Sequence, residues 1–278
     1  MVINSYSKIN LSLKVNSKLK NGLHEIQSMY CLVNLYDKIQ IKKTKKNKDK
    51  IIFKGRFSKF IKKKNNSIYN LLKILRKLNL ISNYYSISVI KNIPVFSGLG
   101  GGTSNAAFLL KFLIKKKIDN DLLNKLEPVI GTDLRLFFSK QGFLKKLKAI
   151  TQLEKRQNLF FLLIQPNIRC STKMIYSKIK LFSKKDRFNN GITRSKSKFL
   201  KYLLNNKNDL QFIVEKKYPV IKKILEDIKN ENGCILSRMT GSGSVCFGLF
   251  EDYEFSKKAL KRLKIKYPKF WFSLAKTI

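Results

Sequence analysis

The chain has 278 residues, 44% of them hydrophobic, so it suits one or two globular domains and is too apolar for a disordered protein. Its 59 Lys and Arg residues against 17 Asp and Glu give a net charge of +42, yet only nine are Arg, the side chain preferred for phosphate and base recognition. No apolar run approaches the roughly 20 residues that cross a bilayer, and the four widely spaced cysteines indicate neither a zinc site nor a disulfide framework.

The N-terminal half is predicted to combine strands and helices. Polar and apolar residues alternate from Tyr6 to Val15, the period of a half-buried strand, and no hydrophobic region of a secretion signal precedes it, so we expect a cytoplasmic protein. Ser67 is placed to cap a helix whose apolar residues follow the helical period. The predicted strands are 6–15, 32–41, 51–53 and 85–90, and the predicted helices are 68–80 and 104–116.

A change of composition between Phe143 and Asn158 predicts a domain boundary, with an N-terminal domain at 1–150 and a C-terminal domain at 151–278. Strands and helices alternate irregularly on both sides of it, which favours an α+β architecture in two lobes over a doubly wound sheet. The C-terminal predictions are strands at 159–165, 234–236 and 245–250, helices at 171–180, 219–229 and 254–264, and a surface loop at 184–198.

Four glycines stand within five residues, from Gly98 to Gly102, between a predicted strand and a predicted helix. Glycine permits positive φ and lets backbone N–H groups approach a ligand closely. The helix that follows adds unpaired N–H groups and the positive end of its dipole. The loop therefore predicts a triphosphate site, with the hydroxyls of Thr103 and Ser104 available to phosphate oxygens or Mg²⁺. It is neither a Walker loop nor a dinucleotide fingerprint, and a flexible turn is the alternative.

A second glycine cluster, Thr240 to Ser244, lies between two predicted strands. A tight hairpin accounts for it when it is taken alone. Together with the first cluster, it is interpreted as another loop that closes over the phosphates or the transferring group.

Five segments, in order along the chain, resemble the GHMP kinases. Pro94 to Ala107 reads P-V-F-S-G-L-G-G-G-T-S-N-A-A and is similar to the ATP loop of that superfamily. More narrowly, three glycines followed by S-N-A-A resemble its 4-diphosphocytidyl-2-C-methyl-D-erythritol kinases. The other matching segments are Ser7 to Leu13, Asn21 to Ile26, Gly131 to Asp133 and Arg238 to Gly243.

This resemblance implies a two-lobed GHMP kinase fold, with an N-terminal lobe like that of ribosomal protein S5 and a ferredoxin-like C-terminal lobe. It also implies that ATP, with Mg²⁺, phosphorylates the 2-hydroxyl of the cytidylyl polyol diphosphate, a step of isoprenoid precursor synthesis. Asp133 would accept the hydroxyl proton, and Lys8 beside it would stabilise charge on the attacking oxygen. The implied ATP-binding residues are Pro94, Val95, Phe96, Ser97, Gly98, Leu99, Gly100, Gly101, Gly102, Thr103 and Ser104.

A pocket for the substrate is implied in the same way. Asn10 would orient the polyol end. His24, the only histidine, would hydrogen-bond the cytosine edge, and Tyr176 would stack on the ring. The substrate-binding set is completed by Thr172, Gly241, Ser242 and Gly243. Without the resemblance, Asp133 would be interpreted as a helix or turn cap, His24 as a surface loop residue and Tyr176 as a core aromatic.

The chain departs from the family pattern at three places. Leu23 stands where a tyrosine is usual, Leu134 and Arg135 replace Val-Pro after the presumed base, and residues 142–147 lack the usual small and acidic side chains. These departures bear on catalytic efficiency and substrate affinity. They leave the glycine loop and the Lys8 and Asp133 positions unchanged.

Two other functions stay open from the sequence. One is a GHMP kinase for mevalonate or homoserine, against which His24 and the S-N-A-A segment argue. The other is a basic nucleic-acid-binding protein with a vestigial site, which would require clustered Arg, whereas the basic residues are spread along the chain. We expect ATP and a small-molecule substrate as ligands, no specific nucleic acid, no membrane, and a monomer or weak homodimer; the positive field would attract anionic substrates.

Overall fold

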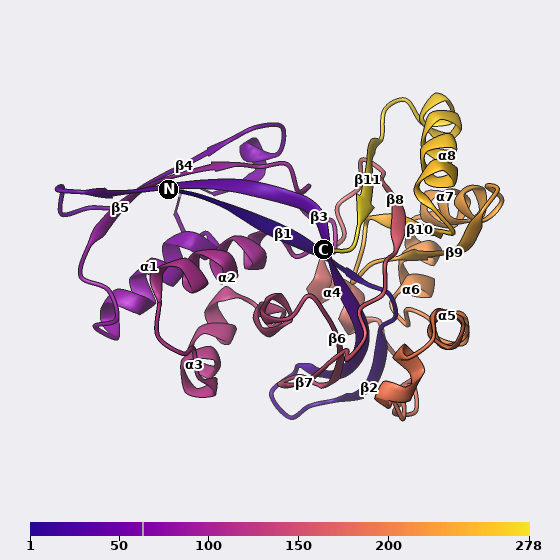
Figure 1. Ribbon diagram of the computed structural model, residues 1–278, viewed down its shortest axis with the longest axis horizontal. Coiled ribbons are helices and arrows are strands. Elements are labelled where there is room, and N and C mark those ends of the chain that lie inside the picture. Colours follow the sequence, from indigo (N-terminus) through magenta and orange to yellow (C-terminus); the bar gives the residue numbers. More distant parts are fainter. Residues whose placement is uncertain (63) are drawn as a thin grey trace. The chain divides into compact units, whose positions relative to one another are not determined.

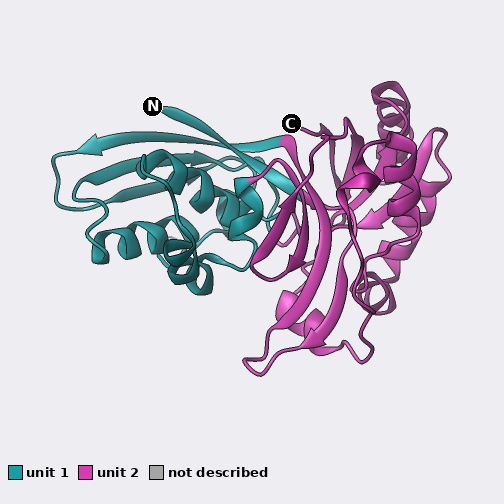
Figure 2. Ribbon diagram, turned by 60° about the horizontal axis from the view of Figure 1, so that its bottom comes forward, with its two compact units in different colours: residues 1–8, 35–95, 100–138 teal, residues 9–34, 96–99, 139–278 magenta. Residues whose placement is uncertain are grey.

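The structure, a computed structural model, describes residues 1–62 and 64–278 (Figure 1). It divides into two compact units, each built from several stretches of the chain (Figure 2). The first unit contains residues 1–8, 35–95 and 100–138, and the second contains 9–34, 96–99 and 139–278. The predicted division into an N-terminal domain at 1–150 and a C-terminal domain at 151–278 stays a prediction.

The first unit has a sheet and three α-helices. Residues 38–44 of strand β3 lie antiparallel to β5, and β4 lies parallel to β5. Strand β1 also pairs with β3, and the Ile41 N–H donates to the Met1 carbonyl at 2.8 Å. The full bounds of these strands are Val2–Asn10 (β1), His24–Thr44 (β3), Lys50–Lys54 (β4) and Tyr84–Ile90 (β5).

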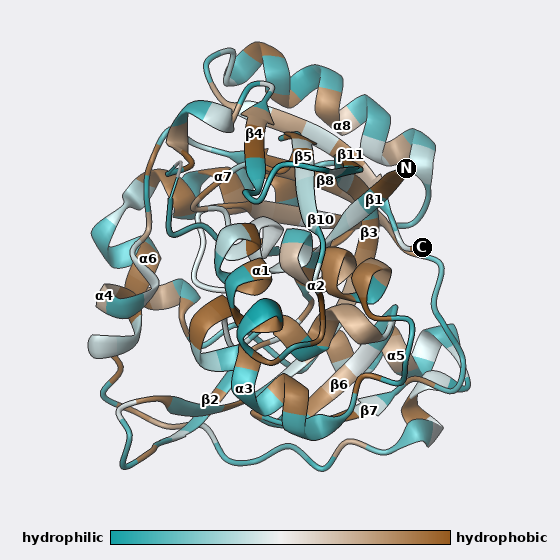
Figure 3. Cartoon of the chain, turned by 90° about the vertical axis from the view of Figure 1, so that its left-hand side faces the viewer, coloured by the Kyte–Doolittle hydropathy of each residue, from teal (hydrophilic) through white to brown (hydrophobic). Residues whose placement is uncertain are grey.

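The helices of the first unit form around an apolar core. In α1 the buried residues are Ile68, Leu71, Leu72 and Leu75, the spacing of one helical face. Helix α2 packs against α1 and is largely brown in the hydropathy view (Figure 3). The helices are α1 (Ser67–Lys77), α2 (Gly101–Leu113) and α3 (Asn120–Ile130), with short 3₁₀ helices η1 (Ser58–Phe60) and η2 (Leu134–Phe138).

The second unit has two antiparallel groups of strands. In one, β2 and β6 both pair with residues of β3, and β7 pairs with β6. The other is a four-stranded sheet of order β11-β8-β10-β9. The strands are β2 (Lys14–Lys18), β6 (Gln141–Lys146), β7 (Ala149–Gln152), β8 (Phe160–Gln165), β9 (Cys234–Met239), β10 (Cys246–Phe250) and β11 (Trp271–Lys276).

Helices α7 and α8 pack on the four-stranded sheet, as Figure 1 shows. Together with the order of its strands, this arrangement is the split βαβ pattern of a ferredoxin-like lobe. The helices and 3₁₀ helix of this unit are α4 (Thr172–Ser177), η3 (Asn190–Thr193), α5 (Lys196–Leu204), α6 (Gln211–Lys217), α7 (Pro219–Lys229) and α8 (Tyr253–Lys266). The α+β prediction is confirmed.

Several local predictions were wrong. The cap of α1 is Asn66, whose side chain accepts from the Tyr69 N–H at 3.0 Å, because asparagine is at least as good a cap as the serine beside it. Helix α2 begins three residues before Ser104, since Gly100 ends the loop with a left-handed turn. The predicted loop at 184–198 includes η3 and the start of α5.

Candidate functional site

Lys8 and Asp133 form an ion pair within the first unit. The Lys8 Nζ lies 3.1 Å from the Asp133 Oδ2, and the side chains are 3% and 30% exposed. Lys8 lies in the buried end of β1, and Asp133 lies between α3 and η2. The pair thus combines a buried ammonium with a carboxylate that has one side open to solvent.

Gly100 brings the glycine loop against this lysine. Its φ of +71° belongs to the left-handed region, and a Cβ there would come 3.3 Å from the Lys8 Cε and 2.9 Å from the Phe137 ring. Only glycine therefore lets the loop pass so close to Lys8. Helix α2 begins at the next residue, so its first N–H groups, which have no partners inside the helix, lie one residue from this contact.

The hydroxyl of Ser104 is used inside the first unit. It donates to the Tyr6 carbonyl at 2.6 Å and lies 2.6 Å from the Ser5 hydroxyl, while the Ser104 N–H bonds to the Gly100 carbonyl. These contacts fix the first turn of α2. They leave the N–H groups of Gly101 to Thr103 as the helix donors that fit an anion, and a phosphate contact by Ser104 stays a prediction.

A buried charged cluster lies beneath that turn. Lys91 donates to Asp37 and, at 3.1 Å, to the Asn105 side-chain oxygen, and Asn105 donates in turn to Asp37 at 2.9 Å. Lys91 is 1% exposed and Asp37 is fully buried. Asn105, the first residue of the Asn-Ala-Ala segment, therefore anchors helix α2 to Lys91 and Asp37. This cluster could not be predicted from sequence, because a lysine is ordinarily interpreted as a surface residue.

Arg135, the departure next to the presumed base, does not point to that base. Its Nε donates to Glu127 at 2.6 Å, and its Nη atoms donate to Asn120 and Asn124 at 2.7 and 3.1 Å. The side chain is 7% exposed. Arg135 thus ties η2 to α3 and stabilises the segment that carries Asp133.

In the second unit, Gly98 of the first glycine cluster contacts the second cluster. A Cβ on Gly98 would lie 2.1 Å from the Thr240 carbonyl oxygen, and the Val245 N–H donates to the Ser97 carbonyl at 3.1 Å. Asn10 joins the same region, because its N–H donates to the Thr240 hydroxyl at 2.9 Å. Its side chain also donates to the Ser28 hydroxyl at 2.8 Å. The turn between β9 and β10 is therefore a hairpin that also packs on residues 96–99.

An aromatic cluster surrounds His24 in this unit. The ring centroids of His24 and Tyr176 are 5.1 Å apart, and Phe182 lies 6.3 Å from His24. Burial, helped by the nearby Lys18 ammonium, lowers the pKa of His24, so the imidazole is neutral at pH 7. The neutral ring presents one donor and one acceptor. Sequence reasoning missed Phe182, an aromatic 46% exposed in a polar stretch, whose only signal was its residue type.

The remaining predicted substrate residues also lie in the second unit. The hydroxyls of Thr172 and Ser242 are 2.8 Å apart, and both residues flank exposed surface. Gly241 and Gly243 have φ values of +55° and +84°, which glycine adopts without strain. Leu23, which stands where an aromatic was expected, is 43% exposed. Each unit thus holds its own part of the predicted set.

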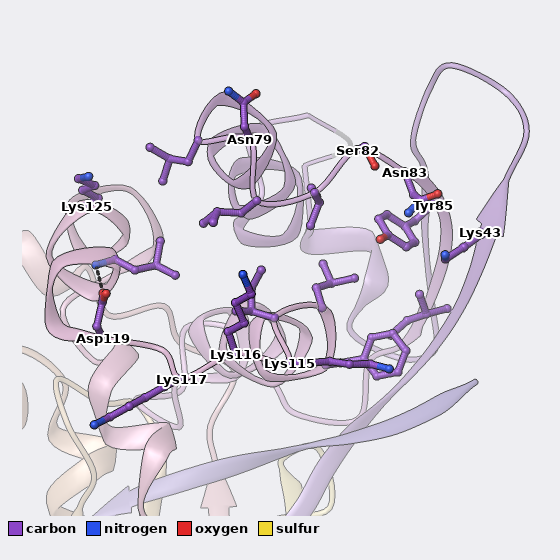
Figure 4. A pocket seen from close by; sticks show the side chains of 18 of the residues that line it. Lys43, Asn79, Ser82, Asn83, Tyr85, Lys115, Lys116, Lys117, Asp119 and Lys125 are labelled. Atoms are coloured by element: carbon purple, nitrogen blue, oxygen red, sulfur yellow. Dashed lines mark hydrogen bonds between the residues drawn. The ribbon is translucent and has the colours of Figure 1, made fainter.

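A groove of about 1300 Å³ lies on the first unit (Figure 4). Its walls come from the C-terminal ends of α1 and α2 and from the start of α3, with Lys43, Lys115 and Lys125 at its rim. Among the residues that the structure describes, its lining includes neither Lys8 nor Asp133.

Within residues 1–62 and 64–278, no helix combines the length and apolar character of a membrane span. In the same part of the chain, no three His, Cys, Asp or Glu side chains gather in a way that would hold a metal ion.

Comparison with known proteins places these residues in a family context. Residues 66–132 match the GHMP kinases N terminal domain, and residues 193–269 match GHMP kinases C terminal. A 4-diphosphocytidyl-2-C-methyl-D-erythritol kinase of Pelagibacter ubique (strain HTCC1062) is 39% identical, over 99% of this chain and 98% of its own. The enzyme of that name from Anaplasma marginale (strain Florida) is 31% identical, over 97% and 94%.

Solved structures show the same fold. A crystal structure of 4-(cytidine 5'-diphospho)-2C-methyl-D-erythritol kinase superposes with a TM-score of 0.75 at 21% identity and covers 99% of both chains. A homoserine kinase from Cytophaga hutchinsonii ATCC 33406 superposes with a TM-score of 0.69 at 15% identity, over 98% and 94%. The fold expected from the five sequence motifs is confirmed.

Proposed function

This chain belongs to the GHMP kinases, and is thereby an ATP-dependent kinase of a small molecule, and we propose that it phosphorylates the 2-hydroxyl of 4-diphosphocytidyl-2-C-methyl-D-erythritol. The full-length similarity to relatives named for that substrate carries the choice of substrate. The contact between Lys8 and Asp133 carries the proposed mechanism.

In the proposed reaction, the substrate hydroxyl oxygen attacks the γ-phosphorus of ATP. A new oxygen–phosphorus bond forms, the bond to the β-phosphate oxygen breaks, and ADP leaves. Asp133 accepts the hydroxyl proton, a step worth typically ~10²–10⁴-fold in rate. The Lys8 ammonium, held 3.1 Å from that carboxylate, stabilises the charge that develops on the attacking oxygen.

The phosphates of ATP are proposed to lie on the N–H groups at the start of α2. Gly100 lets the loop approach Lys8, and the helix dipole favours the negative charge of the triphosphate. Mg²⁺ is proposed to enter bound to ATP, because it usually binds through one or two carboxylates together with substrate phosphates. The Thr103 hydroxyl, in the first turn of α2, would be available to it. When bound, the ion neutralises charge on the β- and γ-phosphates.

The cytosine is proposed to bind at the aromatic cluster of the second unit. Tyr176 and Phe182 offer ring faces, and neutral His24 offers a donor and an acceptor to the base edge. Asn10, Thr172 and the turn from Gly241 to Gly243 are proposed to bind the rest of the substrate. A cytoplasmic location and a monomeric or weakly dimeric state, both expected from the sequence, stay predictions.

Measurement of ADP release with a panel of alcohols tests the substrate. We expect turnover with the cytidylyl substrate, and none above background with mevalonate or homoserine. Turnover of either of those in its place would move the chain to another branch of the family. No turnover with any alcohol, together with tight RNA binding that weakens steeply with salt, would favour the nucleic-acid alternative.

A further inference from the structure

Phe96 has an unusual backbone for a bulky residue. Its φ is +54°, in the left-handed region that favours glycine, and its side chain is 48% exposed. Such a conformation is unfavourable in a residue with a Cβ and persists only where the surroundings impose it. Here the Ser244 N–H donates to the Phe96 carbonyl at 3.1 Å, and the Ser244 hydroxyl lies 3.4 Å from the same oxygen.

The strained backbone directs the Phe96 ring to a cation. The guanidinium carbon of Arg169 lies 5.4 Å from the ring centroid, a cation–π contact on exposed surface. The Tyr218 hydroxyl donates to the Arg169 carbonyl at 3.4 Å, and the Ser244 hydroxyl donates to the neighbouring Ile168 carbonyl at 3.1 Å. The backbone on both sides of the contact is therefore fixed, and Arg169 is an exposed residue.

Two hydroxyls lie on the same segments as this contact. Thr172 follows Arg169 by three residues, and its hydroxyl meets that of Ser242, which stands two residues before Ser244. Each of these polar groups belongs to the second unit. A planar guanidinium with hydroxyls on the adjoining turns is the chemistry that binds phosphate oxygens.

We propose that Arg169, braced by the ring of Phe96, binds the diphosphate of the cytidylyl substrate; this rests on the function proposed above. Tyr176, which is proposed to stack on the base, lies one turn along α4 from Thr172, a rise of about 6 Å. A ribose fills that span between base and diphosphate. The backbone of Phe96 stays within the glycine loop, and only its ring has this role.

Comparison of CDP with cytidine as inhibitors isolates the contribution of the diphosphate to binding. CDP and cytidine share the base and the ribose, and only CDP carries the anion. We expect Arg169→Ala to raise the inhibition constant of CDP about ten- to a hundredfold, the range of a lost charged hydrogen bond. The inhibition constant of cytidine and the KM for ATP should stay within about twofold of wild type, and Arg169→Lys should lose part of the effect because lysine cannot stack as a plane. Arg156→Ala, which removes the same charge from an exposed position of the same unit, is the control and should change none of these constants.

Phe96→Gly tests the role of the ring. Glycine adopts positive φ without cost, so we expect the melting temperature to stay or rise while CDP binds severalfold more weakly. Equal weakening of CDP and cytidine by Arg169→Ala, or no change in either, would overturn the assignment of Arg169. A lower melting temperature of Phe96→Gly with unchanged CDP binding would overturn the role of the ring. Direct calorimetric titration with CDP keeps this test separate from turnover, so it stands even if the wild-type protein phosphorylates another alcohol.

Discussion

The carbonyl oxygen of Thr240 occupies the place where a side chain on Gly98 would begin, 2.1 Å from an ideal Cβ. The first glycine cluster is thus shaped by the second. Because Gly98 and Thr240 both belong to the second unit, the contact is a property of that unit.

Gly98→Ala should therefore be costly. The added methyl group would push the turn at Thr240 away and would strain a φ of +76°. Gly22→Ala is a matched control, because Gly22 has a φ of +79° and nothing within 4 Å of its Cβ position. Strain alone should cost the control about 1–2 kcal/mol, and Gly98→Ala should cost more. Urea denaturation of both variants measures the difference, and equal losses would contradict the packing argument.

Asp133→Asn should keep the fold and reduce turnover by at least about a hundredfold, because the amide cannot accept the hydroxyl proton. The KM for ATP should change little, since the donors proposed for its phosphates are backbone groups. Asp121→Asn removes an exposed carboxylate from the nearby helix and should leave turnover unchanged. Near-normal turnover of correctly folded Asp133→Asn would remove this residue as the base.

The neutral state of His24 predicts a pH dependence. Burial lowers its pKa below 6.5, so the folded protein binds this proton less well than the unfolded chain does. The contribution of the neutral ring to stability is complete above pH 6.5 and is lost as the pH falls through the lowered value. The KM for the cytidylyl substrate should follow the same course, constant above pH 6.5 and rising below it.

His24→Gln is the variant that checks this pH profile. Glutamine keeps a donor and an acceptor but does not titrate, so the rise in KM at low pH should disappear. The KM for ATP should be the same in both proteins at each pH. A rise that persists in His24→Gln would assign the titration to another group.

Asp37→Asn should destabilise the first unit by about 3–5 kcal/mol, because it leaves the buried Lys91 charge without its carboxylate. The added change Lys91→Met should restore part of the loss. Glu226→Gln breaks an exposed pair whose side chains are 60–68% exposed, and it should shift stability by less than about 1 kcal/mol. Chemical denaturation compares the three variants, and a small effect of Asp37→Asn would mean that water reaches Lys91.

The local residue pattern predicts a helix correctly where its apolar residues lie on one face. Helix α7 was predicted with its observed bounds, because Pro219 fits its first turn and Ile221, Ile224, Leu225 and Ile228 are buried on one face. Helix α5 was missed, because its lysines resemble a loop although Phe199 and Leu203 are buried four residues apart. Strand β11, which follows α8, was missed as well.

The contacts of the candidate site could not be predicted from local residue patterns. Nothing in the pattern of the chain pairs Lys8 with Asp133, which are 125 positions apart; the resemblance alone joined them, and their 3.1 Å contact now supports that pairing. The contact between Arg169 and Phe96 had no sequence signal, because it depends on a backbone conformation rather than on residue order. Long-range contacts of this kind need the folded chain.

The second unit is built from stretches that are far apart in the sequence, which affects how it folds. Its strand β2 and residues 24–34 of β3 precede residues 271–278 by more than 200 positions, yet all belong to the same unit, where the Ile278 N–H donates to the Leu32 carbonyl at 3.3 Å. The unit therefore cannot finish folding until these distant residues have met, and such distant pairings close slowly. Until these residues meet, the backbone of β3 near Leu32 lacks these partners, and unpaired strand edges of this kind favour aggregation.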